Sequence, residues 1–131
     1  MAYTTIDDPT DYFNTVLYTG TGSSNAITGV GHSPDFVWTK RRNDSGVNFL
    51  QNTVTGTNKA LISDQTGAEF TGGVDGGTSV TSFDSDGFTV GTEGAINGSS
   101  DSFVSWNWKA GGSASSNSDG SITSSVSANT T

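Results

Sequence analysis

The chain has 131 residues, of which 31% are hydrophobic and 14% charged, and its formal net charge is −8 at pH 7. This length suits one domain with a single core, and the absence of cysteine excludes disulfides and thiolate metal sites. The acidic balance disfavours binding to nucleic-acid phosphates, and no apolar run reaches the roughly 18 residues of a membrane span. The first five residues lack the basic and apolar regions of a secretory signal, so we expect synthesis in a cytoplasm.

The first predicted elements are a short helical turn and a strand. Asp7 and Asp8 precede Pro9, which is typical of an N-cap followed by proline at the first helical position, and one turn is expected to continue through Phe13. The abundant Gly, Ser, Thr and Asn disfavour longer helices. Extended segments bounded by turn residues are expected at residues 15–19, 26–30, 35–42, 49–54, 59–63, 79–83, 88–91, 102–109 and 122–126.

The alternation of side chains in two of these strands indicates which residues form the core. Val104, Trp106 and Trp108 share one face of their strand. Phe36 and Trp38 share one face of another strand. We expect the first face to pack on the core, with Phe36 and Trp38 facing it.

About eight short strands, spaced by roughly 8–12 residues, predict an all-β fold of the β-sandwich or jelly-roll type, with one short helical turn at its N-terminus. Residues 1–112 are expected to form the sandwich module. Residues 113–131 are expected to be a Ser/Gly-rich flexible linker that ends in a weak strand. The segments 66–77 and 93–101 are expected to be loops, the first of them exposed.

Motifs that would support catalysis are sparse. His32 is the only histidine, and an exposed or capping role in a turn explains it. Neither a Gly-x-Ser-x-Gly nor a His-Glu-x-x-His motif occurs. Asp84 and Asp86 could act as a carboxylate pair in a glycosidase, but formation of a tight turn accounts for both. The sequence therefore predicts no enzyme activity, no catalytic residues and no cofactor-binding residues.

The same turn partly matches a calcium-binding loop. In the EF-hand pattern, Asp84, Asp86 and Gly87 would take positions three, five and six, and Glu93 position twelve. Ser82 replaces the aspartate of position one, and the flanking segments are predicted strands. Because four extended residues span about 13 Å, a hairpin would carry Glu93 away from the turn. We interpret the segment as a β-turn and predict no metal site.

Two further groups have both a structural and a binding interpretation. With Trp106 and Trp108 assigned to the core, the loop residue Phe70 is the aromatic side chain best placed to stack on a sugar. The basic residues 40–42 form either a solvated strand end or a contact with an acidic neighbour. Asn-x-Ser/Thr sequons, which a chain this rich in Ser and Thr produces by chance, occur at Asn43, Asn97 and Asn129.

Five segments occur in a fixed order that resembles a known domain family. They read LYTG at 17–20, PDFVWTKR at 34–41, TNKAL at 57–61, SFDSDGFTVG at 82–91 and FVSWNWKAG at 103–111. Over residues 6–112 this series resembles a lectin-like domain of virion proteins, such as tail fibres, of marine and cyanobacterial phages. The resemblance implies a concanavalin A-like β-sandwich. Because a second copy of the module often follows in such proteins, we expect further chain beyond residue 131 or strands supplied by a neighbouring subunit.

The resemblance implies a bacteriophage virion structural protein, the N-terminal module of a tail fibre or spike that takes part in particle assembly and host attachment. Its expected location is the virion, after synthesis in the host cytoplasm. The alternatives are a carbohydrate-binding module for host polysaccharide and a capsid decoration protein, since a lectin-like fold alone does not establish sugar binding. Expected partners are other virion proteins, further copies of the chain (a trimer by analogy with fibres) and a host-surface glycan, without nucleic acid or membrane insertion.

Overall fold

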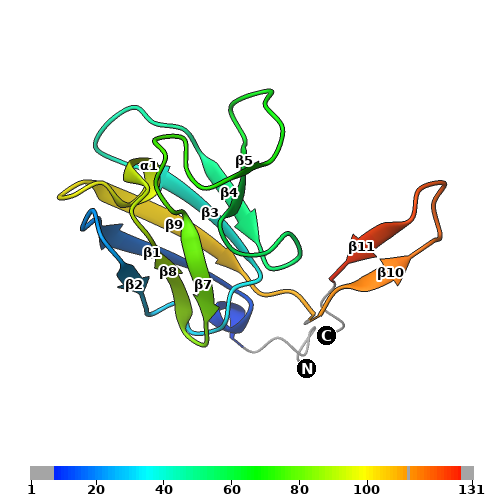
Figure 1. Ribbon diagram of the computed structural model, residues 1–131. Helices are drawn as coiled ribbons and strands as arrows, with labels where there is room; N and C mark the ends of the chain where they lie inside the picture. The colour runs from blue at the N-terminus through cyan, green and yellow to red at the C-terminus, as the bar shows by residue number, and fades with distance from the viewer. Residues whose placement is uncertain (1–7, 112, 128–131) are drawn as a thin grey trace.

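The computed structural model is an all-β sandwich, as the sequence predicts, and it describes residues 8–111 and 113–127. Two antiparallel sheets lie face to face, and a small hairpin extends away from them (Figure 1). The larger sheet has, in spatial order, β1 (Phe13–Thr19), β9 (Ser102–Trp108), β3 (Phe36–Arg41), β4 (Phe49–Asn52), β5 (Lys59–Ile62) and β6 (Phe70–Thr71). The smaller sheet has β2 (Asn25–Ile27), β8 (Gly87–Val90) and β7 (Val80–Asp84).

The predicted helical turn at the N-terminus is confirmed as a 3-10 helix, η1 (Pro9–Asp11). Asp8 is its N-cap, and the Asp8 carboxylate accepts hydrogen bonds from the backbone N–H of Thr10 at 2.9 Å and from its hydroxyl at 2.7 Å. Asp7 lies outside the described residues. The turn ends before Phe13, because β1 already begins there.

The predicted hairpin of the smaller sheet is also confirmed, with Ser85 and Asp86 as its two connecting residues. Gly87 follows them with a φ of 147°, a value that side-chain-bearing residues rarely adopt. A side chain at Gly87 would also overlap the carbonyl oxygen of Ile27 on the neighbouring strand. The glycine therefore permits both the turn and the close approach of β2.

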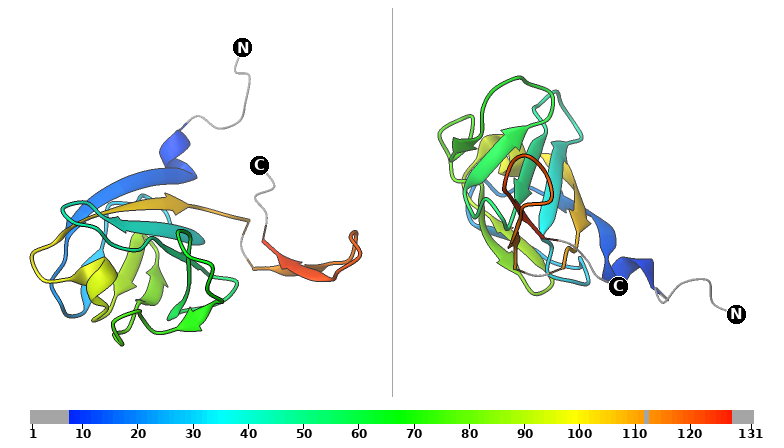
Figure 2. Two further views of the ribbon diagram at one scale, coloured as in Figure 1. Left: turned by 90° about the horizontal axis from the view of Figure 1, so that it is seen from above. Right: turned by 90° about the vertical axis from the view of Figure 1, so that its right-hand side faces the viewer.

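Three short elements were not predicted. The segment expected as a loop at 93–101 contains a one-turn helix, α1 (Gly94–Asn97), which is too short to show helical periodicity. The strand β6 lies inside the Gly-rich segment expected as a loop. Residues expected as a linker form β10 (Ser115–Asn117), which pairs with β11 (Ser124–Val126), the weak terminal strand expected at 122–126, in a hairpin that projects from the sandwich in Figures 1 and 2.

The core lies between the two sheets, but the expected inward face of β9 is wrong. Phe103, Ser105 and Asn107 are the residues of β9 that point into the sandwich, and all three are fully buried. Trp106 and Trp108 lie on the opposite face and are only half-buried. The main buried cluster consists of Ile27, Val37, Phe49, Ala60, Ile62, Val80, Phe88, Val90, Ala95 and Ile96.

The physical reason for the reversal is that the inward face of β9 is partly polar and its donors find hydrogen-bond partners inside the fold, while Asn107 Oδ1 is buried without a partner among the described residues. The Asn107 side-chain amide donates to the Ser105 hydroxyl at 3.1 Å and to the carbonyl oxygen of Asn14 on β1 at 3.1 Å. Buried polar groups are tolerated when they find such partners. The alternation of side chains identifies the two faces of β9, but hydrophobicity alone assigns the wrong face to the core.

Candidate functional site

The outer face of the six-stranded sheet carries a group of aromatic side chains from three adjacent strands. Trp108 of β9 lies between Phe13 of β1 and Phe36 of β3, with ring centroids 5.0 and 5.2 Å away. Two residues further along these strands, Trp38 of β3 lies opposite Trp106 of β9, and their ring centroids are 5.6 Å apart. We call these five residues the aromatic face.

The aromatic face is open to solvent. Phe13 is 39% exposed and Trp38 36% exposed. The apolar surface continues at Leu17 of β1, which is 60% exposed, and at Leu61 of β5, which is 42% exposed. Single exposed apolar side chains are ordinary, but a contiguous group marks an interaction surface. This surface is therefore the strongest candidate binding site in the described part of the chain.

The aromatic face also has polar donors that the fold does not use. Among the described residues, none of the indole N–H groups of Trp38, Trp106 and Trp108 donates a hydrogen bond, and none of the three is a buried, unpaired atom. These donors therefore point to water. A partner that covers the rings must supply acceptors, since a buried unpaired N–H costs about 1–3 kcal/mol.

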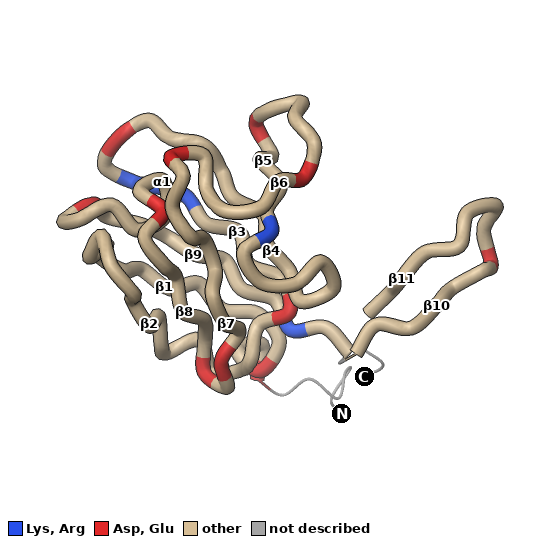
Figure 3. Tube along the Cα trace, viewed as in Figure 1, with Lys and Arg blue, Asp and Glu red and all other residues tan. Residues whose placement is uncertain are grey.

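The electrostatics of this sheet differ from those of the whole chain. The chain has 13 acidic residues, but none lies in a strand of the six-stranded sheet, and those among the described residues are coloured red outside its strands in Figure 3. The charges on its outer face are Lys40 and Lys59, whose ammonium groups donate to the Gly46 carbonyl and the Thr71 hydroxyl. A partner therefore meets a face without carboxylates on a strongly acidic protein.

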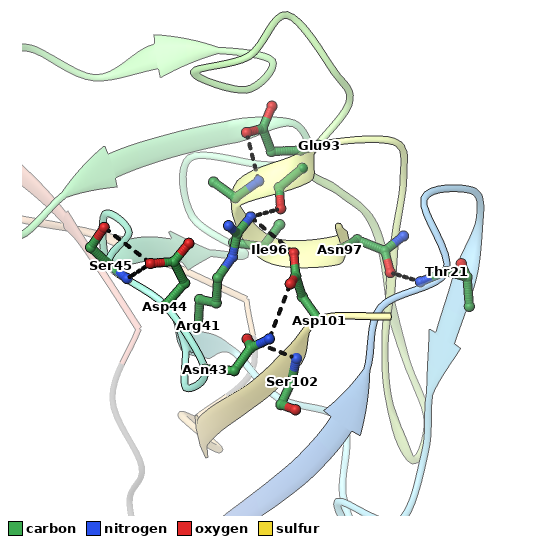
Figure 4. A network of polar contacts seen from close by, with 12 residues as sticks. Thr21, Arg41, Asn43, Asp44, Ser45, Glu93, Ile96, Asn97, Asp101 and Ser102 are labelled. Carbon is green, nitrogen blue, oxygen red and sulfur yellow. Dashed lines mark hydrogen bonds and ion pairs between the residues drawn. The ribbon is translucent and has the colours of Figure 1, made fainter. Parts of the chain in front are cut away.

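At one end of the sandwich, polar side chains hold the loops together (Figure 4). Asn97 is fully buried, and its amide donates to the carbonyl oxygens of Ser23 and Gly91. Its carbonyl oxygen accepts from the Thr21 backbone N–H and the Asn25 side chain. Every hydrogen-bonding position of this side chain is thus occupied, which indicates a structural role.

Glu93 is fully buried beneath the Gly-rich segment. Its carboxylate accepts from the backbone N–H groups of Ala95 at 3.1 Å and Asp75 at 3.3 Å, so it caps α1 and orders the loop. A side chain at Gly73 would overlap this carboxylate, and one at Gly77 would overlap the Glu93 backbone. Gly73 and Gly77 therefore pack against Glu93, while most of residues 66–77 is exposed, as expected.

The carboxylates considered for calcium binding do not come together. The Asp86 carboxylate accepts from the backbone N–H groups of Gly29 and Gly31 at 3.0 and 2.7 Å, and these bonds hold its pKa below the usual range. Asp84 accepts from the Thr89 hydroxyl at 2.7 Å. Glu93 is held in the separate loop contact. The turn interpretation is thus supported, and the described residues contain no metal-binding cluster.

The other side chains considered for binding are also used internally. His32 is 5% exposed, and its Nδ1 lies 2.9 Å from the carbonyl oxygen of Thr10, so it holds the N-terminal turn rather than facing solvent. Phe70 packs edge-on against Phe49, with centroids 5.9 Å apart, and is not a free stacking platform. The sequon residue Asn97 is buried, whereas Asn43 is exposed and Asn129 lies outside the described residues.

The structure divides the basic segment 40–42 between different environments. Arg41 donates to the Gly94 carbonyl oxygen at 2.6 Å and forms an ion pair with Asp101 at 3.4 Å (Figure 4). Its guanidinium also lies over the Phe103 ring. Arg42 is exposed. Lys40 donates to the Gly46 carbonyl oxygen, so Arg42 is the member of this segment whose side chain has no contact within the described residues and can meet an acidic neighbour.

A cavity of about 340 Å³ lies between the sandwich and the projecting hairpin. Its one ionisable lining residue, Asp35, already accepts from the Thr53 hydroxyl and the Ala110 backbone N–H. The cavity thus offers no free charged group to a ligand. The remaining lining residues are Val54, Ser113, Ala114 and Ser125.

The fold and the site together place the protein in the class of all-β sandwiches, with an aromatic face on the outer side of one sheet. Residues 8–131 match the model of a protein family described as a domain of unknown function, DUF7483, and the chain belongs to this family. The match spans the sandwich and the projecting hairpin alike. No curated protein and no solved structure matches the chain. No helix in the described ranges has the length and apolar character needed to span a membrane.

Proposed function

We propose that this protein is a non-enzymatic structural module of a bacteriophage virion, the N-terminal module of a tail fibre or spike that takes part in particle assembly and host attachment. The observation that carries the proposal is the aromatic face, an extended contact surface on a rigid sheet. Binding sites built on strands are held more precisely than sites on loops. The segments that resemble virion domains include Trp38 and Trp106 in adjacent strands, so the resemblance and the contact surface involve the same residues.

The internal use of the polar side chains supports a role without catalysis. General acid–base chemistry needs a titratable group within reach of a substrate. His32 is buried against the Thr10 carbonyl, and the carboxylates of Asp86 and Glu93 accept backbone hydrogen bonds within the fold. In this proposal, the sandwich and its hairpin make contacts with neighbouring virion proteins, and the aromatic face meets the target.

The proposal is tested by locating the protein. Particles of the phage that encodes the chain are purified through a density gradient, and their proteins are identified by mass spectrometry. We expect the protein in intact particles at a fixed ratio to the major tail proteins. Its absence from particles, with normal amounts in the infected cell, would contradict the proposal. Immunogold labelling on heads instead of tails would favour the capsid decoration alternative.

A carbohydrate-binding module for host polysaccharide is the second candidate, because the aromatic face combines ring surfaces with free indole donors. Sugars offer C–H faces for the rings and hydroxyl oxygens for the N–H groups. Titration of the protein with a glycan panel, followed by tryptophan fluorescence, distinguishes the two. A saturable change that disappears in Trp38→Ala favours the sugar module, and no change favours a purely structural role.

A further inference from the structure

The edge strand β1 is open for pairing in a way that the other sheet edges are not. The edges of folded sheets are usually protected by shortness, charge, proline or a bulge. β6 has two residues and β2 has three, while β7 has a bulge between Val80 and Ser82 and ends at Asp84. β1 has seven residues in continuous register with β9, and it contains no charged residue and no proline.

The backbone of β1 shows which groups are free. Tyr12 and Gly20, just outside the strand, are hydrogen-bonded to the extension of β9, through Lys109 N–H and the Asp101 carbonyl. Hydrogen bonding alternates along an antiparallel strand, so the backbone N–H and C=O groups of the even-numbered residues of β1 point toward β9. Those of the odd-numbered residues point away from β9, toward the open edge of the sheet. Phe13 and Leu17 are therefore outward-facing, and in the described chain neither their N–H nor their C=O groups have a partner.

Between these two residues lies Thr15, which also faces outward. The Thr15 N–H donates a hydrogen bond to the Asn14 side-chain oxygen at 2.9 Å, while the Thr15 C=O has no partner in the described chain. Phe13 and Leu17 are equidistant from Thr15 along the strand. A two-fold axis at Thr15, relating two copies of the chain, would therefore bring the free backbone groups of Phe13 in one copy opposite those of Leu17 in the other.

We infer that β1 is the contact through which two copies of this chain associate, by antiparallel pairing of β1 with the same strand of the second copy. Phe13 of one copy lies opposite Leu17 of the other, and the two Thr15 residues face each other at the axis. The pairing is isologous, as in most homodimers. It joins the two larger sheets into one and makes the two aromatic faces continuous.

Charge and side chains favour a second copy as the occupant. Neither β1 nor its neighbour β9 contains a charged residue, so two chains of net charge −8 can approach at this edge without placing carboxylates of the two sheets in contact. The exposed side chains of Phe13 and Leu17 also meet across the new strand pair. The contact is two-fold, in place of the trimer expected by analogy with fibres.

Cysteine cross-linking tests the register, because the chain contains no native cysteine. Hydrogen-bonded residues opposite each other in antiparallel strands have Cα atoms about 5.5 Å apart, within disulfide range. We expect Thr15→Cys to give a disulfide-linked dimer under mild oxidation. Leu17→Cys serves as the control, because its two copies would be about 13 Å apart along the strand and should not cross-link. Efficient cross-linking at residue 17 but not at residue 15 would overturn the register.

Association itself is measured by light scattering after size exclusion, over a dilution series of the full chain. We expect a dimer, and at least tenfold weaker association in Leu17→Lys with an unchanged circular dichroism spectrum, since an edge lysine blocks pairing without disturbing the sheet. Leu61→Lys is the matched control, an exposed leucine on β5 that should not affect the dimer. A monomer at every concentration, a trimer, or a dimer sensitive only at Leu61 would contradict the inference. This result is independent of whether the protein is found in virions.

Discussion

The indole rings of Trp38 and Trp106 lie on neighbouring strands, with centroids 5.6 Å apart and planes inclined by 59°. Both rings are on the solvent side of the six-stranded sheet, whereas Val37 and Ser105, the next residues toward the N-terminus in each strand, are fully buried. The sheet thus has an aromatic outer face and a mixed apolar and polar inner face. This arrangement is the basis of the binding proposals and sets the relative cost of substitutions on the two faces.

Substitutions on the two faces should differ in their effect on stability. Phe103 is fully buried, and Phe103→Ala should lower the free energy of unfolding by about 3–5 kcal/mol. Trp38→Ala removes a larger side chain, but it should cost only about 1 kcal/mol because that side chain is already 36% exposed. Urea denaturation followed by circular dichroism measures both. Equal losses would contradict the assignment of the faces.

Gly73 should be intolerant of a side chain. In Gly73→Ala the new methyl group overlaps the buried Glu93 carboxylate, which two backbone N–H groups hold in place, and such overpacking costs about 1–3 kcal/mol. Gly67→Ala is the matched control in the same segment, because a side chain there meets no atom within 4 Å. Thermal unfolding of the two variants gives the comparison. A loss of stability in the control alone would show that the loop does not pack on Glu93.

Asn97 should contribute strongly to the stability of the fold, although it lies in a helix of only one turn. Asn97→Ala leaves the carbonyl oxygens of Ser23 and Gly91 and the N–H of Thr21 without their partner, and we expect a cost of about 3 kcal/mol. Asn117→Ala, in the projecting hairpin, should change stability by less than about 0.5 kcal/mol. Differential scanning calorimetry of both variants would show comparable unfolding temperatures if this network were unimportant.

Acidification should release the contact made by Asp86. Hydrogen bonds from Gly29 and Gly31 lower the pKa of this carboxyl in the folded state. Its stabilising contribution is therefore present above the pKa of the unfolded chain and is lost as the pH falls through the lower folded value. In Asp86→Asn, stability should fall less steeply between about pH 4 and pH 2 than in the unmodified protein. An NMR titration that gives Asp86 an elevated pKa would contradict the account.

The sequence predicts the strand-rich fold well because most strands are bounded by clear turn residues and contain β-branched or aromatic side chains. The hairpin at Ser85 and Asp86 and the cap at Asp8 follow from local chemistry and are confirmed. Elements of two to four residues, such as β6 and α1, have no periodicity to detect and depend on tertiary contacts.

The candidate site was visible in the sequence but was placed on the wrong side of the sheet. Trp106 and Trp108 are more hydrophobic than Ser105 and Asn107, so composition assigns the tryptophans to the core. The deciding contacts, from Asn107 to Asn14 and from Asn97 to Ser23, join residues far apart in the chain. Local patterns contain no information about such partners, and only the folded arrangement shows that Asn107 donates hydrogen bonds inside the sandwich.

The outward position of the tryptophans is tested most directly by hydroxyl-radical footprinting of the purified full chain, read residue by residue by mass spectrometry. We predict rapid modification of Trp38 in the full chain, rapid modification of Phe13 as well in the monomeric Leu17→Lys variant, and strong protection of Phe49, Phe88 and Phe103 in both. Protection of Trp38 and Phe13 in the monomeric Leu17→Lys variant, together with modification of Phe103, would contradict the proposal that this sheet displays an aromatic binding face.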